Sequence, residues 1–413
     1  MTDERRNLRI LIAFPSSLQQ SGGMEHACCS LASALQGKGH TVQISVLYGG
    51  VPKLFYELNS EVSLSSFMWQ CKEKFHSPYI GRCIPLWGKI IREMLRPVSR
   101  SHMTHWNEWG QARLLRDSIR REVREFVPDV ILSFSVKCTY FLMYALSARI
   151  PVITSLRFNP DHLLKSASKT EIGYLNKSAA VHVLMPSFVK KIKKYGVNCY
   201  VRDIPLAIPQ YPLNVSLEKH KSLYRIINVA RINRLQKRQH LLVEAFSMLE
   251  KDFPDWRVEL WGEEHVFSGN YTNEIRQFIR SHHLEQKVLI RGVTQTIEKE
   301  YESADIFCFP SAFEGFGNAL GEAMSAGLPA VWCRSCPAVN ELIHNGENGF
   351  LADDSAESLA KSLRVLMQDQ DLRVRMGRRA HEMMKAYSAD LVYKKWEDLL
   401  MDAVKYHGRG SCG

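Results

Sequence analysis

The chain has no long apolar run. Although 45% of its 413 residues are hydrophobic, no stretch approaches the roughly 18 consecutive apolar residues that a membrane-spanning helix needs. The first residues include acidic ones and lead into a strand-sized apolar run, which is not the pattern of a secretory signal. We therefore expect a cytoplasmic protein, with peripheral contact to the inner face of the cytoplasmic membrane as an addition discussed below.

The chain also lacks the paired cysteine spacing of a secreted disulfide framework. Its ten cysteines are scattered, and Cys28 and Cys29 are adjacent within a helical pattern, so most are expected to be reduced and buried. Cys333 and Cys336 have redox or metal spacing. They lack a second ligand pair and a thioredoxin-like context, which favours a structural or loop role. The fifteen histidines form no convincing ligand set, and no metal site is predicted.

No internal repeat or low-complexity segment is present, and the charged fraction of 23% is typical of globular proteins. A chain of this length exceeds what one core usually serves, so two domains are expected. Three prolines within residues 205–212 oppose helix formation and indicate a connector. The predicted boundaries are 1–205, 216–390 and a terminal helix over 391–413.

Strand and helix patterns alternate in both halves, which predicts parallel sheets. Near the amino end, a strand over 8–14 is followed by Gly22 and Gly23, a helix to about Gly37 and a strand over 40–47. The paired glycines permit a close backbone approach to a bound group, but the G-x-G-x-x-G dinucleotide fingerprint is missing. In the second half, strands are expected at 256–261, 287–291, 306–309 and 330–332, and the tail over 355–406 reads as consecutive helices.

The segment from Ser311 to Pro329 joins a glycine-rich loop to a helix, and each part carries one carboxylate. The loop holds Glu314, and the helix predicted over 319–326 holds Glu322. Backbone N–H groups at the helix N-terminus would be unpaired and would favour an anionic phosphate. Two nearby carboxylates would accept hydrogen bonds from sugar hydroxyls. The pattern therefore predicts a nucleotide-sugar site.

A basic turn lies upstream of this segment. The strand expected over 225–230 is followed by Arg231 and Lys237 and then by a helical pattern. Ligands bind at the carboxyl ends of strands in open α/β sheets, and an Arg fork with a Lys point charge is a suitable clamp for a diphosphate. The alternative is a solvated basic turn.

The spacing of Glu314 and Glu322 within S-x-x-E-G-F-G-N-x-L-x-E-A-M-x-x-G-L-P resembles family 4 glycosyltransferases of the GT-B fold. The resemblance implies that Glu314 contacts the hydroxyls of the donor hexose and Glu322 those of the ribose. It also implies that Arg231 and Lys237 hold the donor phosphates. The other residues implied to bind the donor are Gly22, Gly23, Gly315, Phe316, Gly317, Asn318 and Ala319.

The same resemblance implies two Rossmann-like parallel-sheet domains that face a cleft, with a helical tail whose last helix crosses back to the first domain. The implied reaction is a retaining, metal-independent transfer of a hexosyl or N-acetylhexosaminyl group from a nucleotide diphosphate sugar, expected to be a UDP-sugar, without another cofactor. The expected acceptor is a hydroxyl of a lipid-linked glycan or a surface polysaccharide precursor such as lipopolysaccharide or O-antigen. Asp369 and Asp371 have the letters of a metal-binding D-x-D motif, but acidic residues at a helix start explain them more simply.

One position departs from the family pattern. After the strand expected over 151–154, many relatives place a histidine near the transferred sugar, and this chain aligns Arg157 there. Arginine stays protonated and cannot act as a base, but it can donate to a sugar hydroxyl or a phosphate. The sugar selectivity is therefore open.

Charge is unevenly distributed between the halves. Residues 1–210 hold 28 basic and 15 acidic residues, giving +13, whereas 211–413 hold 26 and 28, giving −2. The first half includes the basic runs 89–96 and 190–194, with Trp87, Trp106 and Trp109 near the first run. Basic and apolar residues mixed in this way suit anionic lipid headgroups, and a basic face that only aids solubility is the alternative.

Three other interpretations stay open. A nucleotide-sugar epimerase or a phosphorylase can share the two-domain architecture, although the carboxylates or the cofactor-lysine context that they need are not found. A non-catalytic basic protein that binds membranes or polyanions on the same scaffold would show salt-sensitive binding without turnover. Nucleic acid is not an expected partner.

Overall fold

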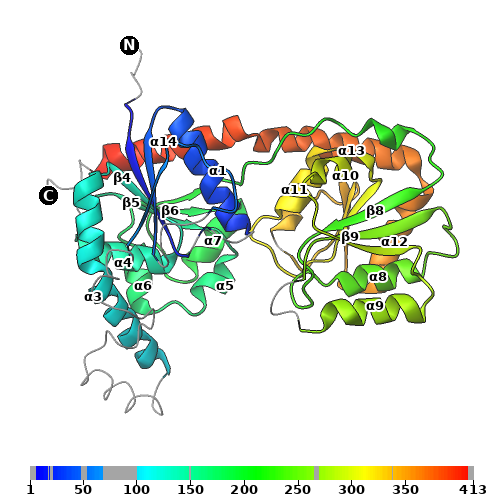
Figure 1. Cartoon of the computed structure of the whole chain (residues 1–413), viewed down its shortest axis with the longest axis horizontal. Coiled ribbons are helices and arrows are strands. Elements are labelled where there is room, and N and C mark those ends of the chain that lie inside the picture. The colour runs from blue at the N-terminus through cyan, green and yellow to red at the C-terminus, as the bar shows by residue number, and fades with distance from the viewer. Residues whose placement is uncertain are drawn as a thin grey trace. The chain divides into compact units, whose positions relative to one another are not determined.

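The computed structural model describes residues 6–16, 18, 22–47, 54–67, 100–147, 150–264, 269–336 and 338–407. The chain divides into two compact units (Figure 1). Unit 1 consists of residues 1–205 and 393–413, and unit 2 of residues 206–392. The basic run 89–96 and Trp87 lie outside the described residues, and so does the side chain of Trp106.

Unit 1 contains a seven-stranded parallel sheet in the order β3-β2-β1-β4-β5-β6-β7. Its strands are β1 (Arg9–Phe14), β2 (Thr41–Val46), β3 (Ser63–Ser66), β4 (Val130–Ser133), β5 (Val152–Leu156), β6 (Ala180–Val183) and β7 (Val201–Asp203). Its helices are α1 (Gly23–Gly37), α3 (Arg100–Phe126), α4 (Val136–Leu146), α5 (Pro160–Leu164), α6 (Lys169–Leu175), α7 (Pro186–Lys193) and most of α14 (Ala389–His407).

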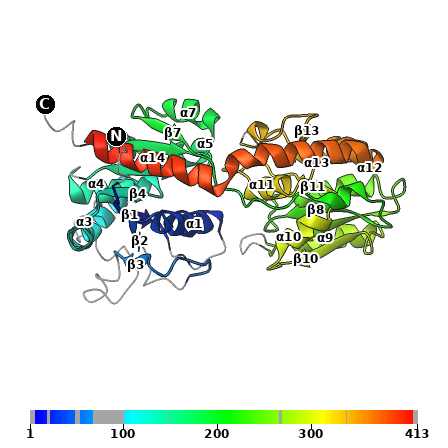
Figure 2. The ribbon, with the colours of Figure 1, turned by 90° about the horizontal axis from the view of Figure 1, so that it is seen from above.

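Both faces of this sheet are covered, which explains why its central strands are apolar throughout. On β1, Leu11 and Ala13 belong to a core formed with α3 and α4, whereas Ile10 and Ile12 alternate onto the opposite face. Helices α1 and α14 lie near each other in the views of Figures 1 and 2. The ammonium of Lys38, the residue after α1, forms an ion pair of 3.2 Å with the carboxylate of Glu397 on α14.

Unit 2 contains a six-stranded parallel sheet in the order β10-β9-β8-β11-β12-β13. Its strands are β8 (Tyr224–Val229), β9 (Trp256–Trp261), β10 (Val288–Gly292), β11 (Ile306–Phe309), β12 (Ala330–Cys333) and β13 (Gly349–Ala352). Its helices are α8 (Gln239–Ser247), α9 (Tyr271–Ser281), α10 (Ile297–Ser303), α11 (Asn318–Ser325), α12 (Ala356–Gln368) and α13 (Gln370–Met384). Helices α8 and α9 cover one face and α11 and α13 the other (Figure 1).

The predicted class of two parallel-sheet, Rossmann-like units with a helical tail is confirmed. In each sheet the strand order reverses beside its first strand, between β1 and β4 in unit 1 and between β8 and β11 in unit 2. Ligands of doubly wound sheets bind at the carboxyl ends of the strands around such a reversal. The fold therefore directs attention to the loops after β8 and β11.

The strands and helices predicted from the sequence are mostly present, but some of their ends are shifted. Strand β5 runs to Leu156, beyond the predicted end at Thr154, because Ser155 and Leu156 are buried and pair with β6. The Asp369 side chain accepts a hydrogen bond of 2.8 Å from the backbone N–H of Leu372 and caps α13, as expected for an acidic residue at a helix start.

Candidate functional site

Two loops meet at the strand reversal of unit 2. The turn after β8 carries Arg231 to Lys237, and the loop after β11 carries Ser311 to Gly317. Residue Gln236 joins them: its carbonyl accepts from the backbone N–H of Ala312 at 2.8 Å, and its side-chain amide donates to the carbonyl of Phe313 at 3.1 Å. These bonds fix the basic turn against the glycine-rich loop, so charged side chains on the two loops are held together.

Lys237, Ser311 and Glu314 form a compact charged group, which we call the Glu314 cluster. One carboxylate oxygen of Glu314 accepts from the Lys237 ammonium at 2.5 Å and from the Ser311 hydroxyl at 2.6 Å. The side chains of Lys237 and Glu314 are only 13% and 11% exposed. The ammonium also lies 4.7 Å from the centre of the Phe309 ring. The structure thus brings two predicted site residues into direct contact and adds Ser311.

The N-terminus of α11 follows directly. Gly317 precedes the helix with a φ of +97°, a left-handed conformation that favours glycine, and no side chain caps the first turn. Residues Gly315, Phe316 and Gly317 are buried, and Asn318 is half-buried. The Asn318 side-chain oxygen is buried and accepts no hydrogen bond from a described residue. Free N–H groups at this end favour an anion, and the free acceptor suits a hydroxyl or amide donor.

Glu322 lies one turn into α11. Its carboxylate accepts a hydrogen bond of 3.1 Å from the Tyr301 hydroxyl of α10. Burial raises the pKa of Glu322, and the Tyr301 hydrogen bond partly opposes that change. The ring of Tyr211 lies 6.0 Å from that of Tyr301, and the pKa of Tyr211 is raised by burial and then by the charge of Glu322. The two tyrosines come from outside the motif, and no pattern in the sequence connects them to it.

Arg231 differs from the other predicted residues of unit 2. It is exposed, and its side chain makes no hydrogen bond or ion pair within the described ranges. It stands on the same turn as Lys237, which pairs with Glu314. Arg231 is thus a cation that no described side chain balances.

The three predicted residues of unit 1 lie at the carboxyl end of its sheet. Gly22 is the residue before α1 and Gly23 the first within it. A Cβ on Gly22 would lie 1.9 Å from a carboxylate oxygen of Glu25, so a side chain there would displace Glu25. Arg157 follows β5 directly, with its guanidinium close to the rings of Phe134 and Trp396.

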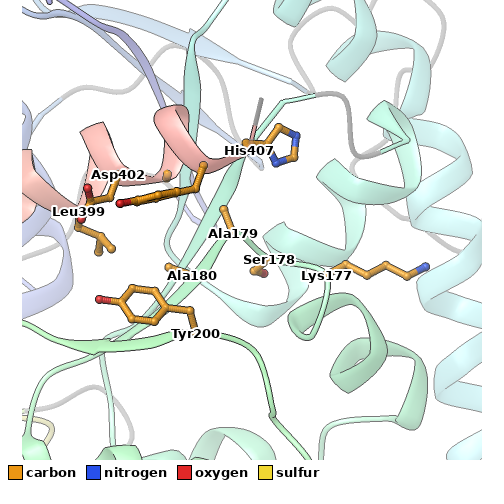
Figure 3. A pocket seen from close by; sticks show the side chains of 10 residues that line it. Lys177, Ser178, Ala179, Ala180, Tyr200, Leu399, Asp402 and His407 are labelled. Carbon is orange, nitrogen blue, oxygen red and sulfur yellow. The ribbon is translucent and has the colours of Figure 1, made fainter. Parts of the chain in front are cut away.

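A cavity of about 720 Å³ lies at the opposite end of the unit 1 sheet (Figure 3). It is lined by Ala179 and Ala180, where β6 begins, by Tyr200 just before β7, and by the last turns of α14. None of the predicted site residues lines it. Because ligands of such sheets bind at the carboxyl ends of the strands, we do not take this cavity as the donor site.

Comparison with solved structures identifies the fold as GT-B. The structure of Anabaena Alr3699/HepE in complex with UDP and glucose matches with a TM-score of 0.70 and 17% identity, covering 96% of this chain and 100% of that one. The structure of a point mutant of Staphylococcus aureus TarM in complex with fondaparinux, α-GlcNAc-glycerol and UDP matches with a TM-score of 0.70 and 15% identity, covering 95% and 99%.

Residues 214–383 match the family described as glycosyl transferases group 1. An uncharacterized glycosyltransferase of Haemophilus influenzae is 29% identical over 160 residues, 38% of this chain and 44% of that protein. A Campylobacter jejuni α-1,4-N-acetyl-D-galactosaminyltransferase acting on a diphospho-undecaprenol glycan is 22% identical over 405 residues, 95% of this chain and 98% of that protein. The chain spans less than half the length of the first curated relatives that it matches. These likenesses support a GT-B glycosyltransferase, and family 4 membership stays a prediction.

Proposed function

We propose that this protein is a retaining glycosyltransferase that moves a hexosyl or N-acetylhexosaminyl group from a UDP-sugar to a hydroxyl of a lipid-linked glycan or polysaccharide precursor. The observation that carries the proposal is the Glu314 cluster, which lies at the strand reversal of unit 2 and directly before the uncapped N-terminus of α11. Support also comes from the relatives, whose names specify sugar transfer, and from structural neighbours solved with UDP.

The carboxylates would recognise the two sugars of the donor. Glu314 has one oxygen engaged by Lys237 and Ser311, which leaves its other oxygen to accept from hydroxyls of the transferred hexose. Glu322 would accept from the ribose hydroxyls, with Tyr301 orienting its carboxylate. Ionised carboxylates are acceptors only, so both would select for ligands that present hydroxyl donors.

The diphosphate would be held by cations and backbone N–H groups. The charge of Lys237 is already balanced by Glu314, so the net positive charge for the phosphates would come mainly from Arg231 and the α11 N-terminus. Gly315, Phe316, Gly317, Asn318 and Ala319 would approach the donor through this end of the helix. In unit 1, Gly22, Gly23 and Arg157 would provide further donor contacts.

In the reaction, the bond between the anomeric carbon and the β-phosphate oxygen breaks, and the acceptor oxygen bonds to the same face of that carbon. The acceptor proton passes to an oxygen of the leaving phosphate, so no protein base is needed. Negative charge grows on the diphosphate as the bond breaks, and Arg231, Lys237 and the helix N-terminus would stabilise it. Such preorganised electrostatics commonly contributes most to catalysis. We propose that these groups suffice without a metal ion.

A binding panel of UDP, GDP and ADP with their common sugar conjugates tests the donor site by calorimetry and thermal shift. A ligand that binds only the folded state raises the melting temperature, so no acceptor is required. We expect UDP ligands to stabilise the wild type and not the Glu322→Ala variant. Absence of binding by every nucleotide would contradict the proposal and favour a non-catalytic polyanion-binding protein on the same scaffold.

We further propose that unit 1 contacts an anionic membrane surface at the cytoplasmic side. No described helix is long and apolar enough to cross a bilayer. On α7, Phe188 and Ile192 are buried while Lys190, Lys193 and Lys194 near its end are exposed, so the basic face points to solvent. Vesicles containing anionic phospholipid should bind the protein at low salt and release it at high salt. Equal binding to neutral vesicles would contradict this.

A further inference from the structure

Arg157 lies beside two aromatic rings at the carboxyl end of the unit 1 sheet. Its guanidinium carbon lies 4.5 Å from the ring centre of Phe134, at the end of β4, and 5.1 Å from that of Trp396 on α14. The residue as a whole is half-buried. The ring faces are apolar neighbours of the cation and supply no hydrogen-bond acceptor in the plane of its N–H groups.

Two nitrogens of this guanidinium, Nε and Nη2, are buried and have no hydrogen-bond partner among the described residues. These two nitrogens form one edge of the guanidinium and send their N–H bonds the same way, which is the geometry that grips a carboxylate or phosphate with two parallel hydrogen bonds. Two other arginines of the chain use both nitrogens of this edge. Arg225 donates Nε and Nη2 to one oxygen of Glu259, and Arg9 donates both to the carbonyl of Phe126.

No anionic group among the described residues balances this cation. The titratable groups that interact with its charge are the thiol of Cys28, the phenol of Tyr393 and the imidazole of His182. Burial raises the pKa of Cys28 and of Tyr393, so both stay neutral at ordinary pH. The pKa of His182 is lowered by burial and then by the Arg157 charge, so the imidazole is neutral too. Burial also lowers the pKa of Arg157 to about 10, which leaves it charged at neutral pH.

Arg373 shows how the same chain treats a buried arginine with a structural role. Its guanidinium carbon also lies near two rings, 5.1 Å from the centre of Tyr224 and 5.1 Å from that of Trp256, which stack on each other, and its Nε has no hydrogen-bond partner among the described residues. Yet it also donates from Nη1 to the carbonyls of Leu366 and Met367 and lies in the field of Asp305. Leaving a buried charge unpaired is costly. Arg373 has two carbonyl acceptors and a nearby carboxylate, whereas Nε and Nη2 of Arg157 have no described acceptor.

We propose that the free edge of Arg157 binds an oxyanion of a substrate with two parallel hydrogen bonds. The inference rests on the proposed function and makes it more specific. The oxyanion is either the carboxylate of an acidic transferred sugar or a phosphate of the donor or of a lipid diphosphate acceptor. Arg157 would thereby be a specificity-determining residue that favours an anionic substrate where the related family uses a histidine.

The test compares affinities for UDP, UDP-glucose, UDP-glucuronate and geranyl diphosphate by calorimetry, in the wild type and in Arg157→Met and Arg157→Lys. Arg157→Lys keeps a charge but lacks the two-nitrogen edge. Arg202→Met is the matched control, because Arg202 is an exposed arginine of the same unit with no side-chain partner within the described ranges. Melting temperatures without ligand are measured for all four proteins.

If the oxyanion is a sugar carboxylate, the wild type binds UDP-glucuronate at least about tenfold more tightly than UDP-glucose, and both Arg157 variants lose this preference. If it is a donor phosphate, both variants weaken UDP and the two UDP-sugars alike by about tenfold or more. If it is an acceptor phosphate, only geranyl diphosphate binding falls. In each case Arg202→Met resembles the wild type, because charged contacts of this kind are local.

A folded Arg157→Met variant that binds every probe with wild-type affinity would overturn the proposal. If Arg157 has only a structural role, Arg157→Met melts at a lower temperature than the wild type and its binding is unchanged. If the Arg157 charge is unpaired in the ligand-free protein, removing it leaves the melting temperature equal or higher. The proposed function is judged separately. Loss of UDP binding in Glu322→Ala, together with full binding in Arg157→Met, would retain the donor site and reject only the role of Arg157.

Discussion

Replacing Lys237 by Met separates the structural from the functional part of the Glu314 cluster. The substitution leaves the Glu314 carboxylate, which is 11% exposed in the ion pair, with Ser311 as its remaining side-chain donor among the described residues. Breaking a fully buried ion pair from one side costs about 3–5 kcal/mol, and an exposed pair contributes about 0–1 kcal/mol. With both side chains about one-tenth exposed, we expect a loss of about 2–3 kcal/mol in the free energy of unfolding.

The assay is urea denaturation of the ligand-free protein, with thermal melting as a second measure. For a domain the size of unit 2, a loss of this magnitude lowers the melting temperature by about 4–12 °C. The double variant Lys237→Met with Glu314→Gln removes both charges and should recover to within about 1 kcal/mol of the wild type. It should still turn over at least about tenfold more slowly, because it lacks Lys237, one of the proposed phosphate contacts, and the Glu314 carboxylate proposed to bind the sugar.

Lys221→Met is the matched control. Lys221 pairs with the buried Asp305 at 2.7 Å, and Asp305 precedes β11, away from the carboxyl end where the predicted site lies. This control should lose comparable stability and keep wild-type turnover per folded molecule. Recovery of both stability and turnover in the double variant would refute our reasoning, since the Glu314 cluster would then be only a structural ion pair.

Three further predictions concern the same unit. Arg231→Met should leave the melting temperature within about 1 °C, because the side chain is exposed without a described partner, yet cut turnover at least about tenfold; wild-type turnover would contradict its phosphate role. Glu322→Gln should abolish UDP binding while making the ligand-free protein relatively more stable as pH rises. The pKa of Glu322 is raised in the folded state, so its contribution to stability is fully present below the unfolded-state pKa and is lost as pH rises through the folded-state pKa. Plots of melting temperature against pH for the wild type and the variant should therefore converge near about pH 4, and a pH-independent difference would contradict this. Turnover should be unchanged in a divalent chelator, and strict dependence on a divalent ion would refute the metal-independent mechanism.

Much of the fold was predictable because its strands are buried on both faces. The apolar runs of β9 and β11 have the predicted ends, whereas β5 extends two residues further, because its last pairing depends on the neighbouring β6. Glu314 was predictable as a candidate from the motif and Lys237 from the basic turn, whereas Ser311 was not identified as a site residue. The contact between Glu314 and Lys237 was not predictable, because it requires β8 and β11 to be neighbours in the sheet, and the order of strands is not written in either loop.

The environment of two other site residues could not have been predicted locally. Glu322 was identified in the motif, but its partner Tyr301 comes from the helix before β11. Arg157 was aligned with a family position, but the two rings that lie close to its guanidinium belong to the end of β4 and to a helix near the end of the chain. Contacts between distant segments arise only when the whole unit packs, so the residue types carry no trace of them.

Unsatisfied polar atoms at two of the predicted site residues add support to the assignment of the site that is independent of the motif. Folded proteins pair nearly all buried polar groups, and exceptions are expected where a ligand supplies the missing partner. Such atoms also occur away from the predicted site, as at the Thr272 hydroxyl and the Nε of Arg373, and those at predicted site residues are the Asn318 oxygen in unit 2 and the Nε and Nη2 edge of Arg157 in unit 1. One lacks a donor and the other an acceptor, and each lies at the carboxyl end of its sheet.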